Sequence, residues 1–136
     1  PDGRIDAILA WSALPGASRH HWGTDIDVID RAATAQGYLP QLVPAEYAPG
    51  GVFHRLDAWL TASMSRFGFY RPYVRDLGGV RPEAWHLSHA DTAGPACGGL
   101  TAEIMQEAIE SADIEGKERL IERMDEIRER YVVERQ

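Results

Sequence analysis

Two clusters of histidine and carboxylate residues lie far apart in this chain, and they constrain its fold more than any other feature. The first is SRHHWGTDID at 18–27, and the second is RPEAWHLSH at 81–89. Zinc sites in hydrolases combine imidazole and carboxylate ligands and leave one coordination position open for water. If the two clusters share one metal, the chain must fold back and bring both stretches together. Taken separately, each cluster could equally be a polar surface loop.

The first cluster joins a turn to a predicted strand. Gly23 lets the chain turn sharply, and the segment DIDVID at 25–30 begins by alternating polar and apolar residues, which is typical of a strand. Asp25 and Asp27 therefore share one face of that strand. We expect a histidine that folds back over the turn to meet Asp27.

The second cluster places an acid shortly before a histidine. Glu83 precedes His86 by three residues, and a flat strand would put these two side chains on opposite faces. A general base must lie close to the water that it activates. We therefore expect Glu83 in a turn before the strand, a placement that Pro82 favours, with Trp85 facing away into the core.

The remaining patterns predict an α+β fold in which helices flank a small, mainly antiparallel sheet that carries the site. Residues 31–51 have no clear period and are predicted to be a long ordered loop. In the helix 51–69, we expect one apolar stripe that includes Trp59 and Phe67. The predicted helices are 4–14, 51–69, 101–112 and 115–133, and the predicted strands are 25–30, 69–74 and 84–89.

Charge and composition exclude several classes of function. The net charge of −7 argues against nucleic-acid binding, which needs a basic surface, and against an anionic membrane. No run of apolar residues is long enough for a membrane span. The single cysteine, Cys97, precedes two glycines and is predicted to lie in a loop with a structural role.

Other residues near the clusters have weaker signals. His54 falls within a predicted helix, so we expect a surface or packing role. The aromatic residues that could line a substrate cleft are Trp22, Tyr38, Tyr47, Tyr70 and Tyr73, and Trp22, beside the turn, is the strongest of these candidates.

The two clusters together resemble the D-alanyl-D-alanine carboxypeptidase family of zinc peptidases, which includes VanY- and VanX-type enzymes. SRHHWGTDID matches Ser-x-His-x-x-Gly-x-x-x-Asp, and EAWH matches Glu-x-Trp-His, over about residues 4–90. The resemblance implies that His20, Asp27 and His86 bind Zn²⁺ and that Glu83 is the catalytic base. The motif residue Ser18 would support the loop, and its neighbours His21, Trp22, Asp25 and Trp85 are further candidates for substrate contact or for supporting the ligands.

This resemblance implies a zinc metallopeptidase, a carboxypeptidase or an endopeptidase, in which Glu83 assists attack by zinc-bound water. The implied substrates are peptidoglycan stem peptides that end in D-Ala-D-Ala. The implied compartment is the bacterial periplasm or the extracellular cell wall. An alternative is a zinc-containing module of the same fold that binds cell-wall peptide or protein without catalysis. The acid at Glu83 favours the enzyme, because a binding module needs no base.

The chain departs from the resembled pattern at two points. The family usually has alanine at the position of Asp25, which could tune the metal or contact substrate. Family members also carry an arginine upstream of the first cluster, and Arg4 does not fit that motif. Because the sequence opens without methionine, we expect one peptidase domain over 1–136 that lacks its N-terminal part. Within it, 101–136 is expected to form a helical extension that covers the sheet or mediates association.

Overall fold

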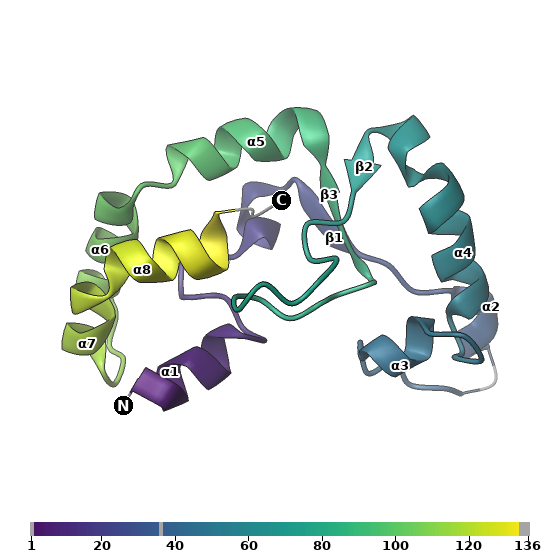
Figure 1. The fold of residues 1–136 in the computed structure, drawn as a ribbon, viewed down its shortest axis with the longest axis horizontal. Coiled ribbons are helices and arrows are strands. Elements are labelled where there is room, and N and C mark those ends of the chain that lie inside the picture. The colour runs from purple at the N-terminus through teal and green to yellow at the C-terminus, as the bar shows by residue number, and fades with distance from the viewer. Residues whose placement is uncertain (1, 36, 134–136) are drawn as a thin grey trace.

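A computed structural model describes residues 2–35 and 37–133 and has an α+β architecture built around a three-stranded antiparallel sheet (Figure 1). The strand order is β1-β3-β2, so β2 is at an edge, as expected from the nearby Pro72. The strands are β1 (Asp25–Asp27), β2 (Phe69–Tyr70) and β3 (His86–His89). Residues 134–136 of the predicted extension lie outside the described part.

The sheet register gathers polar side chains on one face. Asp25 pairs with Ser88 and Asp27 pairs with His86 across β1 and β3. Because cross-strand partners and residues two apart share a face, all four side chains project to the same side. The opposite face carries the Ile26–Leu87 pair, and Leu87 is buried. The polar face is thus formed by two segments that are distant in the sequence, since Asp27 and its partner His86 are 59 positions apart.

Helices pack on both sides of the sheet and form two separate cores (Figure 1). On one side, α1 packs with the C-terminal helices around buried residues such as Met105, Ile109 and Ile127. On the other side, Tyr47, Phe53 and Trp85 form a smaller cluster. The helices are α1 (Asp2–Leu9), α2 (Arg31–Thr34), α3 (Pro44–Tyr47), α4 (His54–Ser63), α5 (Ala90–Gly99), α6 (Ala102–Ser111), α7 (Lys117–Glu122) and α8 (Met124–Ile127).

Three single turns complete the chain. They are the 3₁₀ turns η1 (Arg19–Trp22) and η2 (Met64–Phe67) and the π-helical turn η3 (Arg128–Val132). Among the described residues, no helix is both long and apolar enough to cross a membrane. The helix predicted at 101–112 is confirmed as α6, with the Thr101 hydroxyl accepting from the Ile104 amide at its start.

Several sequence-based predictions of local structure are wrong. The loop predicted at 31–51 contains α2 and α3, because the Asp30 carboxylate caps α2 through the amides of Ala32 and Ala33 and Pro44 starts α3. Helices of four residues depend on their caps, and they are too short for a periodic pattern of apolar residues to be recognised in the sequence. Cys97 lies in helix α5, where its Sγ contacts the Val132 carbonyl oxygen at 3.8 Å.

Other helices are shorter than predicted. The first ends at Leu9, and the segment 115–133 divides into α7, α8 and η3, with the break at Arg123. The stripe predicted in 51–69 is also partly wrong, since α4 ends at Ser63 and η2 changes the helical pitch. Trp59 within α4 and Phe67 at the end of η2 are both exposed.

Candidate functional site

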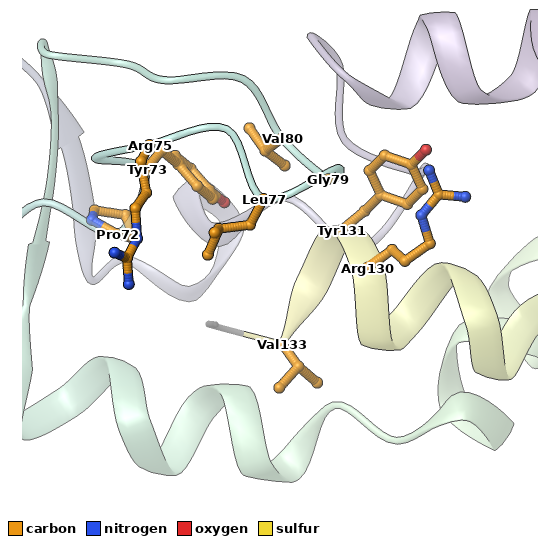
Figure 2. A pocket seen from close by; sticks show the side chains of 9 residues that line it. All are labelled: Pro72, Tyr73, Arg75, Leu77, Gly79, Val80, Arg130, Tyr131 and Val133. Atoms are coloured by element: carbon orange, nitrogen blue, oxygen red, sulfur yellow. The ribbon is translucent and has the colours of Figure 1, made fainter. Parts of the chain in front are cut away.

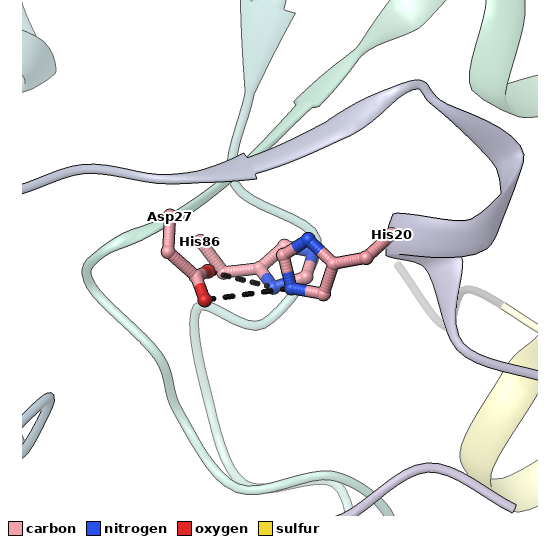
Figure 3. Close-up of side chains that lie close together, drawn as sticks. All are labelled: His20, Asp27 and His86. Atoms are coloured by element: carbon pink, nitrogen blue, oxygen red, sulfur yellow. Dashed lines mark ion pairs between the residues drawn. The ribbon is translucent and has the colours of Figure 1, made fainter.

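The side chains of His20, Asp27 and His86 lie together at the polar face of the sheet (Figure 3). One possible ligand atom from each lies within 4.8 Å of the others. The Asp27 carboxylate is 3.4 Å from Nε2 of His20 and 3.3 Å from Nδ1 of His86. Imidazole and carboxylate donors at this spacing fit a divalent cation such as Zn²⁺. The sequence-predicted ligand set therefore converges in space.

The turn η1, which precedes β1, positions His20 at the site. Ser18 precedes η1 and accepts the His21 amide through its backbone carbonyl, and Gly23 ends the turn with φ of 72°. This left-handed conformation favours glycine. His20 then folds back over β1, and its ring lies 4.7 Å from that of His86. His21 stays exposed on the outer side of the turn.

Glu83 lies beside the same group. It stands in the turn before β3, with its amide bonded to the Tyr73 carbonyl, as the spacing of the second cluster predicts. Its carboxylate is 3.4 Å from Nδ1 of His86. The Tyr73 ring packs edge-on against His86 with ring centroids 5.0 Å apart. An acid is thus placed next to the possible metal position but outside the set of three donors.

These side chains border a cleft of about 280 Å³. Glu83 and His86 lie at its wall with Tyr73, while His20 and Asp27 are more exposed. The side chains of His20 and Asp27 are 42% and 32% exposed, so solvent reaches the metal position from the cleft. A smaller hollow shares Tyr73, Val80 and Tyr131 with the cleft (Figure 2). It is lined by Pro72, Tyr73, Arg75, Leu77, Gly79, Val80, Arg130, Tyr131 and Val133.

The predicted cleft aromatics divide between different surroundings. Tyr73 lines the cleft as expected. Trp85, which was expected to face the core, packs into the smaller core and also borders the cleft. The other tyrosines make hydrogen bonds: Tyr38 to Glu46, Tyr47 to the Val28 carbonyl, and Tyr70 with Arg19. Trp22 packs against the larger core and under the Arg19 guanidinium, 4.9 Å from the ring centroid.

Asp25 lies behind the site and not in the cleft. Its carboxylate accepts hydrogen bonds from Arg19, Thr24, Ser88 and His86. Burial alone would raise its pKa, but the hydrogen bonds from His86, Thr24 and Arg19 hold the pKa below the ordinary value of an aspartate. Asp25 is therefore a buried, ionised acceptor.

The electrostatic surroundings of His86 favour a cation at this position. Burial alone would lower its pKa, but hydrogen bonds with Asp25, Asp27 and Glu83 raise the pKa to about 10. Without a metal, three carboxylates thus surround one imidazolium. A divalent cation bound here would neutralise the negative charge of the same carboxylates.

Two residues of this site were not found by sequence reasoning. Ser88 donates to Asp25 at 2.9 Å, and strand alternation from His86 could have placed it on the ligand face. Arg19 donates to Asp25 at 2.8 Å and to Ser88 at 2.7 Å. Since Arg19 lies in a single 3₁₀ turn, no periodic pattern indicates where its side chain points.

Comparisons with known proteins agree with the arrangement. The model of the family VanY, D-alanyl-D-alanine carboxypeptidase, matches residues 2–92. An uncharacterized protein of Haemophilus influenzae is 34% identical over 122 residues, which cover 88% of this chain and 93% of that protein. No solved structure matches the chain significantly.

Proposed function

Since the chain belongs to the VanY family of D-alanyl-D-alanine carboxypeptidases, we propose that it is a zinc-dependent peptidase acting on peptidoglycan stem peptides. The preferred reaction is removal of the terminal residue from a peptide that ends in D-Ala-D-Ala. The observation that carries this proposal is the position of His86, whose Nδ1 lies within 3.4 Å of both Asp27 and Glu83. A possible metal ligand and an acid outside the ligand set thus lie side by side at the wall of a cleft.

The ligands in this proposal are Nε2 of His20, a carboxylate oxygen of Asp27 and Nδ1 of His86. A zinc ion bound there would polarise the scissile carbonyl and lower the pKa of a water molecule. The exposure of His20 and Asp27 leaves the cleft side of this position open, as a catalytic zinc site requires.

Glu83 is assigned the role of general base and then general acid. Its carboxylate stands beside the ligand set and faces the same cleft, so it can take a proton from the attacking water. The same group returns the proton to the leaving amine. A module that only binds cell-wall peptide would have no use for this acid, and Glu83 therefore favours the peptidase.

The direct test combines metal analysis with a defined substrate. We expect the purified chain to bind about one zinc ion and to release D-alanine from a pentapeptide ending in D-Ala-D-Ala, detected by mass spectrometry of the products. Chelation should stop the release, and added zinc should restore it. Zinc binding with an intact pentapeptide would support the binding module, while absence of zinc binding would contradict both functions.

The expected compartment is the bacterial cell wall or periplasm.

A further inference from the structure

A buried ion pair lies directly behind the candidate zinc ligands. Nε of Arg19 is 2.8 Å from Oδ2 of Asp25, and the two side chains are 3% and 0% exposed. The same guanidinium donates to Ser88 and to the Tyr70 hydroxyl. Ser88 in turn donates to Oδ1 of Asp25 at 2.9 Å. The Asp25 carboxylate is therefore fixed from two directions.

Asp25 contacts both histidines of the candidate site. Its Oδ2 is 2.7 Å from Nε2 of His86, and its backbone carbonyl oxygen is 3.2 Å from Nδ1 of His20. A carboxylate and a carbonyl can only accept hydrogen bonds, so each ring nitrogen that faces Asp25 must carry the proton. The opposite nitrogens, Nδ1 of His86 and Nε2 of His20, are left as the metal-facing donors. These are the two nitrogens nearest to Asp27 (Figure 3).

We propose that Asp25, held by Arg19 and Ser88, is a positioning residue that fixes the ring orientation and tautomer of His86 for metal binding. This inference rests on the proposed zinc-dependent function. Outer hydrogen-bond partners of this kind orient metal-ligating histidines, and their loss commonly lowers metal affinity by about 10- to 100-fold.

The competing explanation is that the Arg19–Asp25 pair only stabilises the fold. The two roles can be separated because removing one partner leaves a buried charge unpaired, while removing both does not. We therefore compare Asp25→Ala, Arg19→Met and the double variant. The readouts are the zinc dissociation constant from chelator competition, the visible spectrum of the Co²⁺-loaded protein and the melting temperature of the metal-free protein.

We expect Asp25→Ala to raise the zinc dissociation constant by about 10- to 100-fold and to alter the Co²⁺ spectrum. The double variant should recover melting temperature relative to Asp25→Ala but keep the weak zinc binding, because nothing then holds Nε2 of His86. If Asp25→Ala does not fold, the double variant alone carries the test. A purely structural pair predicts that metal affinity recovers together with stability.

A matched control is the pair Asp57 and Arg71. It is also an Arg–Asp ion pair, with Nη2 of Arg71 2.8 Å from the Asp57 carboxylate, but within the described residues no histidine bonds to either side chain. We expect Asp57→Ala with Arg71→Met to leave the zinc dissociation constant unchanged.

The outcomes distinguish this inference from the proposed function. Suppose that the wild-type protein binds zinc and cleaves peptide, and that the double variant has the zinc affinity and the Co²⁺ spectrum of the wild type. This result would overturn the positioning role only. Wild-type protein that binds no zinc would overturn both. Weak zinc binding by the double variant, with recovered stability and an unchanged control pair, would support the positioning role.

Discussion

The imidazole of His86 is held between two carboxylates, with Nε2 2.7 Å from Asp25 and Nδ1 3.3 Å from Asp27. The two ring edges therefore have different surroundings. The Nε2 edge faces the buried network of Arg19 and Ser88, and the Nδ1 edge faces the cleft. This division is the basis for the proposal that Nε2 of His86 is a hydrogen-bond donor to Asp25 and that Nδ1 is a metal ligand.

Replacing His86 with alanine should remove a metal donor outright. We expect His86→Ala to lower zinc affinity by more than the roughly 10- to 100-fold loss typical of an outer partner, as measured by metal analysis and chelator competition. His89→Ala is the matched control, because His89 lies on the same strand but bonds to Thr92 and packs against Phe69. Unchanged zinc content in His86→Ala would contradict the ligand assignment.

Replacing Glu83 should separate catalysis from metal binding. Glu83→Gln keeps the size of the side chain but cannot accept the proton, so we expect hydrolysis to fall by roughly 10²- to 10⁴-fold. Zinc stoichiometry should stay at the wild-type value, since Glu83 is outside the proposed ligand set. Zinc loss in Glu83→Gln would show that this acid is a ligand.

Acid should weaken the ion pairs that join α1 to the C-terminal helices and the ion pairs within those helices. Hydrogen bonds from Arg119 to Asp2 and from Arg123 to Glu126 hold the pKa of each carboxyl at about 2, against ordinary values of 3.8 and 4.5. Carboxyls whose pKa is lower in the folded state contribute stability above their unfolded pKa and lose it as pH falls through the folded pKa.

We therefore expect the melting temperature to fall between about pH 4.5 and pH 2. Because these groups are largely exposed, the effect should shrink at high salt. Arg123→Met should flatten part of the pH dependence. A slope identical to that of the wild type would show that the Arg123 contacts with Glu126 and Asp6 make no contribution.

Gly79 tests the contact between the loop that precedes β3 and the π-helical turn η3. A Cβ on Gly79 would overlap the carbonyl oxygen of Arg130, whose guanidinium also donates to the Gly78 carbonyl. We expect Gly79→Ala to lower the free energy of unfolding by about 1–3 kcal/mol, measured by denaturant titration. Gly98→Ala in α5, where a Cβ meets no atom within 4 Å, is the control and should not destabilise. Equal stability of the two variants would contradict this contact.

The sequence by itself determined the parts of the site that depend on local geometry. Strand alternation places Asp25 and Asp27 on one face, and the spacing from Glu83 to His86 requires a turn before the strand. Both are features of the structure, as is the convergence of the two clusters. The first two predictions succeed because backbone period and motif spacing are properties of short segments, whereas the convergence was expected from the resemblance to the zinc peptidases.

Tertiary structure alone decided what surrounds those residues. Arg19 and Trp22 lie in a short turn that has no periodic hydrophobic pattern. Only the tertiary structure therefore decides that Arg19 bonds to Asp25 and that Trp22 packs against the larger core. The same holds for Trp59, which the helical pattern predicts to be buried but which is 56% exposed and lies against the ring of the similarly exposed Phe67. A sequence pattern specifies the face that a side chain occupies, whereas its burial and partners depend on segments distant in the chain.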